Sequence, residues 1–186
     1  PYSNSKACAE LLTKAYRNSF FNNEDILVAT ARAGNVIGGG DWSSNRLVPD
    51  FIRAWKSQTE LLIRHPSATR PWQHVLEPLS GYMWLAAQLF ENKTELNGEA
   101  FNFGPQDSVN VPVKDLVNSI DQFWNGVQLK IEEGNSQQKE ANLLKLSCDK
   151  ALARLKWQAN LNFHETIKLT TEAYKCFYQN PKDYPA

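Results

Sequence analysis

The sequence predicts an α/β protein built on parallel strands, and three observations lead to that prediction. Residues 3–20 place apolar side chains at helical spacing, with charged side chains between them. Residues 26–30 form a short, almost entirely apolar run, as in a parallel strand that is buried on both faces. Residues 33–41 then supply four glycines within seven residues. Because ligands of open α/β sheets bind beyond the carboxyl ends of strands, this glycine-rich segment is an expected ligand-binding loop.

Further along the chain, helices and strands continue to alternate. We expect a helix over residues 49–56, a short strand over 61–63, and a helix opened by Pro78, whose missing amide costs little in a first turn. A strand over residues 100–103 is followed by a Gly-Pro turn, and residues 112–124 have the pattern of another helix. The order of these elements is typical of an α/β fold.

A final helix is predicted from a start signal and an apolar stripe. Asn162 and Glu165 have the spacing of a capping box, in which each side chain accepts from the other residue's backbone amide. We expect this helix to pack on the body of the protein through Phe163, Ile167, Thr171, Tyr174 and Tyr178.

The composition argues for a small-molecule partner. The 186 residues are 42% hydrophobic, and twenty basic side chains balance twenty acidic ones. Without a basic run, the sequence gives no electrostatic argument for a nucleic acid or an anionic membrane. No apolar run approaches the roughly 20 residues that span a bilayer. The three cysteines fit neither a zinc site nor a disulfide framework, so reduced thiols in a cytoplasmic protein are expected.

One residue pair near the start of the first helix could carry acid–base chemistry. Tyr2 and Lys6 are four residues apart, so both side chains lie on one helix face, about one turn apart. An ammonium near a phenol favours the phenolate and lowers the tyrosine pKa, which would make Tyr2 a general base. By spacing alone, an ordinary solvated helix pair remains the alternative.

The surrounding residues resemble a known family. The segment Pro1-Tyr2-Ser3-Asn4-Ser5-Lys6 is similar to the active-site helix of extended short-chain dehydrogenases. Residues 144–157 resemble the family's C-terminal helix and turn, and residues 38–42 and 70–78 resemble its CDP-glucose 4,6-dehydratase branch. Four more motifs follow in the family's order: Arg32-x-x-Asn35-Val36-x-Gly38, Arg46-Leu47-Val48-Pro49, Arg70-x-Trp72-x-x-Val75 and Gly98-Glu99-x-x-Asn102-x-Gly104.

This resemblance implies a fold and a domain division. The fold would be the C-terminal part of a Rossmann-like doubly wound parallel sheet, plus a smaller mixed α/β substrate-binding lobe. Residues 1–34 would end the NAD-binding domain, and residues 35–186 would form mainly the substrate lobe, with some segments returning to the sheet. The family's dinucleotide fingerprint, Ser or Thr partner and dehydration Asp-Glu pair are not in the sequence. We therefore expect a C-terminal fragment that alone binds NAD poorly and is inactive.

The resemblance also implies a reaction, nucleotide-sugar 4,6-dehydration with NAD. Tyr2 would take the proton of the sugar 4-hydroxyl while hydride passes to NAD. Water would then leave across C5 and C6, and the hydride would return to C6. Lys6 would hold the nicotinamide ribose and tune Tyr2, and the backbone of Arg32 and Ala33 would border the nicotinamide.

The implied substrate site contains three polar residues. Asn35 and Arg70 match positions that hold the diphosphate, and Arg46 would add to that cluster; a guanidinium suits bidentate phosphate binding. The alternatives are a surface ion pair for Arg70 and a left-handed turn for Asn35. Trp42 and Trp72 either stack on the sugar or base or contribute packing. Base recognition would involve residues 61–64 and 101–103.

Other polar residues receive no chemical role. The three histidines form no ligand spacing, so no metal site is expected. Glu77 and Glu99 are declined as the dehydration acid and base, because the family carries that pair before its tyrosine.

Several alternatives stay open on the sequence. The same residues would serve a UDP-, dTDP- or GDP-sugar dehydratase or 4-epimerase, and Lys139 stands where CDP-glucose enzymes often carry histidine. A non-catalytic sugar-nucleotide-binding module is the alternative from another class.

Relatives form a homodimer or homotetramer by packing this first helix, and the stripe from Ala7 to Tyr16 is wide enough for such contact. The expected pathway is deoxysugar synthesis for a surface polysaccharide.

Overall fold

The computed structural model describes residues 2–21, 26–106, 110–124, 126–131 and 145–180. Its helices are α1 (Tyr2–Phe20), α2 (Leu47–Ser57), α3 (Leu76–Phe90), η1 (Thr94–Leu96), α4 (Val113–Trp124), η2 (Ala151–Leu155) and α5 (Phe163–Gln179). Its strands are β1 (Thr30–Ala33), β2 (Asn35–Ile37), β3 (Leu61–Ile63), β4 (Thr69–Arg70), β5 (Trp72–His74), β6 (Ala100–Phe103), β7 (Val111–Pro112) and β8 (Leu129–Ile131).

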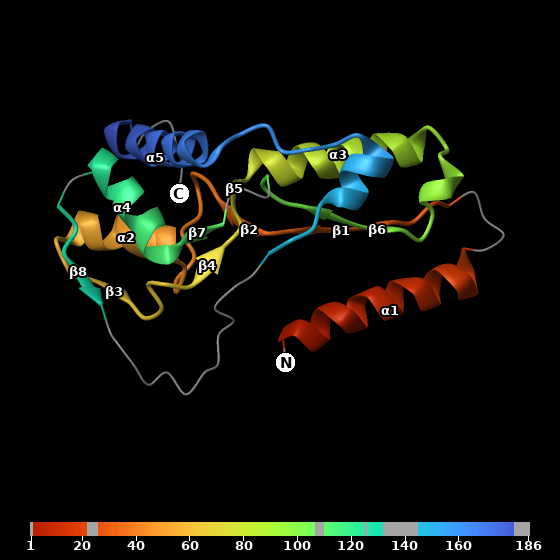
Figure 1. The fold of residues 1–186 in the computed structure, drawn as a ribbon, viewed down its shortest axis with the longest axis horizontal. Helices are drawn as coiled ribbons and strands as arrows, with labels where there is room; N and C mark the ends of the chain where they lie inside the picture. The colour runs from red at the N-terminus through yellow and green to blue at the C-terminus, as the bar shows by residue number, and fades with distance from the viewer. Residues whose placement is uncertain (1, 22–25, 107–109, 125, 132–144, 181–186) are drawn as a thin grey trace.

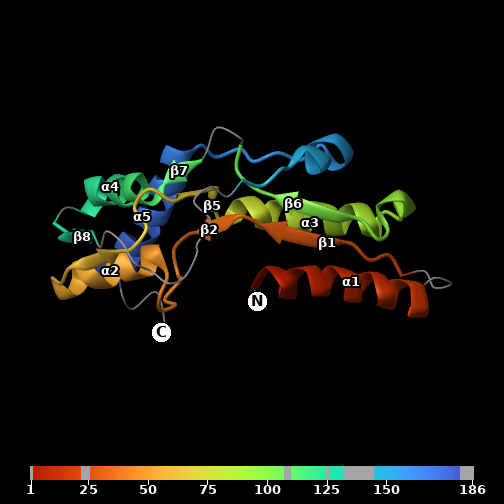
Figure 2. The ribbon, with the colours of Figure 1, turned by 60° about the horizontal axis from the view of Figure 1, so that its bottom comes forward.

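One half of the molecule is a parallel strand pair between two helices. β1 pairs with β6 in a register that sets Thr30 opposite Ala100 and Ala33 opposite Phe103. Helix α1 lies along one face of this pair and α3 along the other (Figure 1; Figure 2). The N-terminal helix is therefore positioned by the strand that follows it.

The other half combines three short strand pairs with three helices. β2 pairs in parallel with β5, and β3 in parallel with β8, whereas β4 and β7 are antiparallel. Helices α2, α4 and α5 gather around these strands (Figure 1). Ala33 ends β1 and Asn35 begins β2, so the chain passes from one half to the other through the single residue Gly34.

Each half has its own cluster of buried side chains. In the half with α2, α4 and α5, Phe51, Ile52 and Ile120 are fully buried. In the half with α3, Phe101 and Phe103 of β6 are buried against η2 and α3. The expected boundary near residue 34 nevertheless stays a prediction, because a cluster of contacts does not define a domain.

The expected α/β class with parallel strands is confirmed, as are most of the predicted elements. α2 begins two residues before Pro49 and α3 two residues before Pro78. The capping box is confirmed: the Glu165 amide donates to Asn162 Oδ1 at 2.9 Å, and the Asn162 amide donates to Glu165 Oε2 at 2.8 Å. On the predicted stripe of α5, Ile167, Thr171 and Tyr174 are buried.

The strand predicted over residues 26–30 is misplaced, because the observed strand is Thr30–Ala33. The backbone before Thr30 bonds to a turn instead of to a neighbouring strand. The Val28 amide donates to Asn97 Oδ1 at 3.1 Å, and the Val28 carbonyl accepts from the Gly98 amide at 2.6 Å. Ile26 is 45% exposed, so the apolar run is not buried on both faces.

The amphipathic first helix is confirmed, but its apolar stripe faces outward. Leu11, Leu12, Tyr16 and Phe20 are each more than half exposed. The opposite side of the helix approaches β1 through Glu10, which accepts hydrogen bonds from Thr30. In the described part of the chain, no helix is both long and apolar enough to cross a lipid bilayer.

Candidate functional site

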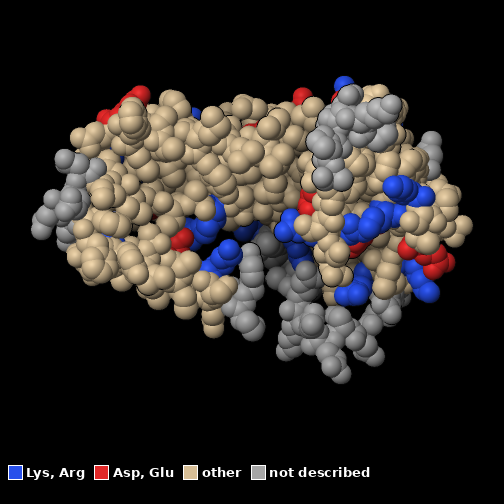
Figure 3. All heavy atoms as spheres, turned by 180° about the vertical axis from the view of Figure 1, so that it is seen from behind, with Lys and Arg blue, Asp and Glu red and all other residues tan. Residues whose placement is uncertain are grey.

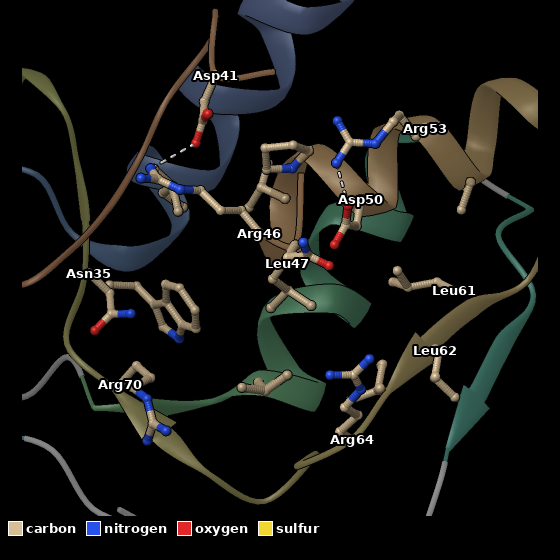
Figure 4. A pocket seen from close by; sticks show the side chains of 18 of the residues that line it. Asn35, Asp41, Arg46, Leu47, Asp50, Arg53, Leu61, Leu62, Arg64 and Arg70 are labelled. Carbon is tan, nitrogen blue, oxygen red and sulfur yellow. Dashed lines mark hydrogen bonds and ion pairs between the residues drawn. The ribbon is translucent and has the colours of Figure 1, made fainter. Parts of the chain in front are cut away.

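A pocket of about 950 Å³ lies between the glycine-rich segment, α2 and β3. It brings together the three residues predicted to bind substrate, Asn35 of β2, Arg46 just before α2, and Arg70 of β4. Figure 4 shows these three on one side of the pocket, with Leu61 and Leu62 of β3 on the other. A volume of this order is within the range of small-molecule sites in proteins.

The wall of the pocket is rich in charged side chains. Arg46, Arg53, Arg64 and Arg70 all line it, together with Asp41 and Asp50. Seen from behind Figure 1, basic side chains gather on the half that carries α2 and β3, with acidic ones among them (Figure 3). Glu60 also lines the pocket, so four guanidinium groups face three carboxylates, and this excess of positive charge favours an anionic ligand.

Two of the arginines are paired with carboxylates in the same wall. Arg46 Nη1 lies 3.2 Å from Asp41 Oδ2, and Arg53 bonds to Asp50 (Figure 4). Burial alone would raise the pKa of Asp41. Hydrogen bonds from Ser43 and the charge of Arg46 outweigh that effect, so its pKa is lowered and the carboxylate stays ionised. The Arg46 side chain is 64% exposed, which leaves it accessible to a ligand.

The Arg70 side chain is held more firmly than that of Arg46. The residue is only 7% exposed, and its Nη1 donates to the backbone carbonyl of Thr69 at 2.8 Å. Its backbone lies in the β4–β7 pair, opposite Val111. A buried guanidinium in the pocket wall is not the surface ion pair that was the alternative interpretation. Its role toward a ligand remains a prediction.

The loop between β2 and α2 is fixed from two sides. Arg53 donates to the backbone carbonyls of Trp42 and Ser43, each at 3.0 Å. From α5, Tyr174 donates to the carbonyl of Asp41 at 2.6 Å. Burial, followed by the Asp41 charge, raises the pKa of Tyr174 to about 12, so the phenol keeps its proton. These contacts hold the loop that carries Arg46.

The glycine-rich segment passes close to α5. A Cβ atom placed on Gly39 would lie 2.2 Å from the Cβ of Ala173, a distance that real Cβ atoms do not reach. Glycine is therefore required here for close packing of the loop on the helix.

The two tryptophans have different surroundings. Trp72 is buried in the pocket wall and donates from Nε1 to the carbonyl of Val111 at 3.0 Å. Trp42 packs on α5, with ring centroids 5.2 Å from Tyr174 and 4.6 Å from Phe177. These contacts favour the packing interpretation for both residues.

Of the predicted cofactor-contacting residues, Arg32 and Ala33 directly precede the pocket lining along the chain, whereas Tyr2 and Lys6 lie on α1. Ala33 ends β1, and the pocket lining begins at the next residue, Gly34. The Arg32 side chain turns away to Asn102 Oδ1, at 3.0 Å, and to Glu10. Lys6 is exposed on α1. Tyr2 begins α1, but its side chain lies outside the described residues.

The two glutamates that were declined as catalysts have structural partners. Glu77 is buried, and its Oε1 accepts from the backbone amide of Asn160 at 2.9 Å and from that of Leu161. Glu99 is paired with Lys150 and Arg154. Both carboxylates thus fasten segments of the chain to each other. Among the described residues, no group of His, Cys, Asp and Glu could hold a metal ion.

Three polar residues of this region were not singled out from the sequence. Asp50 and Arg53 line the pocket, and Gln73, which is 1% exposed, donates to the carbonyl of Phe103 at 2.9 Å. The position of Arg53 one turn after Asp50 was a readable signal for a pair on one helix face. The contact of Gln73 with Phe103 joins residues thirty apart, and no local pattern predicts it. Lys139, which bore on the nucleotide preference, lies outside the described residues.

Comparisons with known proteins agree with this arrangement. Residues 1–170 match the family model described as GDP-mannose 4,6 dehydratase. The chain is 41% identical over 182 residues to a CDP-glucose 4,6-dehydratase of Salmonella typhimurium, covering 95% of this chain and 50% of that protein. The chain thus spans about half the length of this curated relative.

Solved structures share the fold. An epimerase of Methanothermobacter thermautotrophicus superposes with a TM-score of 0.81 at 23% identity, over 98% of this chain and 52% of that one. A dTDP-glucose 4,6-dehydratase of Bacillus anthracis, in complex with NAD, has a TM-score of 0.74 at 18% identity, over 96% and 53%. A dTDP-glucose 4,6-dehydratase of Streptomyces venezuelae has a TM-score of 0.73 at 19% identity, over 99% and 52%. The mixed α/β fold with parallel strand pairs is therefore shared with these three proteins, over about half of each of their chains.

Proposed function

This chain belongs to the GDP-mannose 4,6 dehydratase family, and from that membership we propose that the whole protein is an NAD-dependent CDP-glucose 4,6-dehydratase. The observation that carries the choice of substrate is the 41% identity to a CDP-glucose 4,6-dehydratase, sustained along 95% of this chain. Because the chain spans half of that relative, the activity is proposed for the whole protein and not for these residues alone.

In this proposal the pocket binds the diphosphate of the sugar nucleotide. Arg70 is buried and oriented by Thr69, so little side-chain freedom is lost when it binds phosphate. Asn35 adds an amide donor from the start of β2. Arg46 would exchange its partner Asp41 for a phosphate oxygen, since that ion pair is solvent-exposed and weak.

The nucleoside would lie along the other wall of the pocket. Leu61 and Ile63, which are both buried, line this wall, and Arg64 follows at the end of β3. Base selection would come from residues 61–64, one of the two segments that the family resemblance implies; the other, residues 101–103, does not line this pocket.

The residues present fit the nicotinamide end of NAD. Lys6 is exposed on α1, and a lysine ammonium can donate to ribose hydroxyls, while β1 ends at Ala33, directly before the pocket. The sequence has no glycine fingerprint for the pyrophosphate, so these residues would hold only the nicotinamide half. When bound, NAD supplies the acceptor for the hydride of the sugar C4 and the donor that returns it to C6.

Tyr2 acts as the general base of the first step in this proposal. The positive charge of Lys6, one helical turn away, stabilises the phenolate form of Tyr2, which takes the proton of the 4-hydroxyl and becomes a neutral phenol. Glu77 and Glu99 do not serve in the loss of water from C5 and C6, because both are engaged in structural contacts.

Three further properties belong to the proposal. The whole protein would work in the cytoplasm, as a homodimer or homotetramer that packs the α1 helices together through their exposed apolar stripe. Its 4-keto-6-deoxy product would feed the synthesis of a surface polysaccharide. The exposed fractions of Leu11 and Phe20, 69% and 62%, support a covered α1 in the assembled protein.

A turnover assay tests the proposal. The whole protein with NAD is given CDP-glucose, UDP-glucose, dTDP-glucose or GDP-mannose, and NMR follows the 4-keto-6-deoxy product. We expect product from CDP-glucose above the others, and its loss in Tyr2→Phe. Preference for another nucleotide would correct the substrate, and inversion at C4 without loss of water would indicate a 4-epimerase. Binding of CDP-glucose without any product would indicate a non-catalytic module.

A further inference from the structure

Glu10 on α1 joins the first helix to strand β1. The Thr30 hydroxyl donates to the Glu10 carboxylate, at 3.0 Å from Oε1 and 2.8 Å from Oε2. Arg32 Nη1 lies 3.4 Å from the same Oε1. The Glu10 side chain is 30% exposed, so these contacts are shielded in part from water. Figure 2 shows α1 running alongside β1.

The position of Glu10 relates these contacts to Tyr2 and Lys6. The three residues follow each other at intervals of four, so their backbone positions lie along one face of α1. The face that meets β1 at Glu10 is therefore the face that carries the proposed base and its lysine. The angle and height of α1 over the strand decide where those two side chains lie.

The contact continues beyond β1. Arg32 Nε donates to Asn102 Oδ1 on β6 at 3.0 Å, and Asn102 Nδ2 donates to the carbonyl of Ser147 at 3.0 Å. One chain of polar contacts thus runs from α1 across both strands to the segment before η2. Because β1 ends one residue after Arg32, this chain fixes α1 relative to the residues that open the pocket.

We infer that Glu10 is a positioning residue for the reaction: its carboxylate holds α1 on β1 so that Tyr2 and Lys6 lie at the nicotinamide end of the strand. This inference rests on the proposed function and assigns to it a residue that does not touch substrate or cofactor. The physical reason is that catalysis by proton and hydride transfer is sensitive to displacements of about 1 Å. Nearer the C-terminal end of α1, Arg17 Nη1 donates to the carbonyl of Asn97 at 2.8 Å, so Glu10 is the attachment that lies closer to Tyr2 and Lys6.

The test compares matched variants of the whole protein. Glu10→Ala removes the acceptor, Thr30→Val removes the donor hydroxyl at nearly constant volume, and Thr30→Ser restores that hydroxyl. Glu172→Gln is the control, because it breaks an exposed pair with Lys168 on α5. Measured quantities are kcat and KM for CDP-glucose, and the Kd for NAD from titration calorimetry.

We expect kcat to fall roughly 100-fold in Glu10→Ala and in Thr30→Val. The affinity for NAD should fall with it, because Lys6 is displaced, while KM for the sugar nucleotide stays unchanged, because the pocket residues are untouched. The double variant should fall no further than either single one, and Thr30→Ser and Glu172→Gln should match the unsubstituted protein.

An unchanged kcat and NAD affinity in Thr30→Val and Glu10→Ala would overturn the inference. So would equal losses in kcat, KM and thermal stability, since a general loss of folding gives that pattern. If Glu10→Ala does not fold, the comparison of Thr30→Val with Thr30→Ser tests the inference alone. If the unsubstituted protein gives no product from CDP-glucose, the proposed function fails, and the NAD affinities of the same variants still decide the role of Glu10.

Discussion

The hydroxyl of Tyr174 donates to the backbone carbonyl of Asp41 at 2.6 Å, which joins two residues 133 positions apart in the chain. The carboxylate of the same Asp41 is paired with Arg46 in the pocket wall. Tyr174, in the middle of α5, therefore lines the pocket and also supports the loop that carries one of the pocket's arginines. The consequence is that the C-terminal helix helps to shape the pocket through the loop that it holds.

Replacing Tyr174 with Phe tests this support. The variant loses the hydrogen bond to Asp41 but keeps the buried ring, so we expect the free energy of unfolding to fall by about 1 kcal/mol. The affinity for CDP should fall as well, because the loop that carries Arg46 is less constrained. Urea unfolding and titration calorimetry measure the two effects. A stability loss with unchanged affinity would show that the loop keeps its conformation without this bond.

Arg70 should account for a large part of the affinity for a diphosphate. Charge-assisted hydrogen bonds contribute roughly 1.5–3 kcal/mol, so Arg70→Ala in the whole protein should bind CDP about 10- to 100-fold more weakly. Arg154→Ala is the matched control, because that arginine pairs with Glu99 away from the pocket. Equal affinities of the two variants in calorimetry would contradict the diphosphate role.

His74 should make stability depend on pH. Burial lowers its pKa below the ordinary value of 6.5, although the charge of Glu77 acts in the opposite direction. A lowered pKa means that the folded state binds the proton less readily than the unfolded chain. The neutral form of His74 therefore contributes fully to the free energy of unfolding above pH 6.5. This contribution is lost as the pH falls below that value. Protonation would also remove the acceptor for the Leu76 amide, 3.3 Å from Nδ1.

Two histidine variants isolate this effect. His74→Asn keeps an acceptor for the Leu76 amide but cannot be protonated, so the fall in unfolding free energy between pH 7 and pH 5 should be smaller than in the unsubstituted protein. His164→Asn, at an exposed position, should leave the slope unchanged. The same slope in all three proteins, measured by urea unfolding, would exclude His74 as its source.

Glu77 should prove structural. Glu77→Gln keeps the oxygen that accepts from Asn160 and Leu161, whereas Glu77→Ala leaves these amides without it. A hydrogen bond to a charged group contributes about 1.5–3 kcal/mol, so the alanine variant should be less stable by about that much. The glutamine variant should keep most of its turnover. If turnover instead vanished in a stable glutamine variant, Glu77 would be a catalytic acid or base after all.

Local signals were enough to predict most elements of this fold. The capping box at Asn162 and Glu165 depends on residues three apart, and the structure has both of its hydrogen bonds. The strand near residue 30 was misplaced because its ends depend on a distant partner. Val28 bonds to Asn97 and Gly98, and no pattern within residues 26–30 contains that information.

The sequence also predicted the residues of the candidate site in part, because short motifs identify some of them. Asn35, Arg46 and Arg70 were identified by resemblance to family motifs, and the structure brings them into one pocket. The supports of that pocket were not identified. Tyr174 was read only as a packing residue, because its hydrogen bond to Asp41 spans most of the chain. Glu10 could have been noticed from its spacing to Lys6, but its partner Thr30 lies on another element.

The passage from Ala33 through Gly34 to Asn35 has a consequence for how such proteins can diversify. The end of the strand that would border the nicotinamide and the first polar residue of the pocket are separated by one residue, so they are inherited together. The far wall, made by residues 61–64, is a separate stretch of chain. In the proposed function, exchange of residues 61–64 alone would change which nucleotide is accepted and leave the positions of the reacting groups unchanged. Residues 61–64 are therefore the segment to replace in a design for another sugar nucleotide.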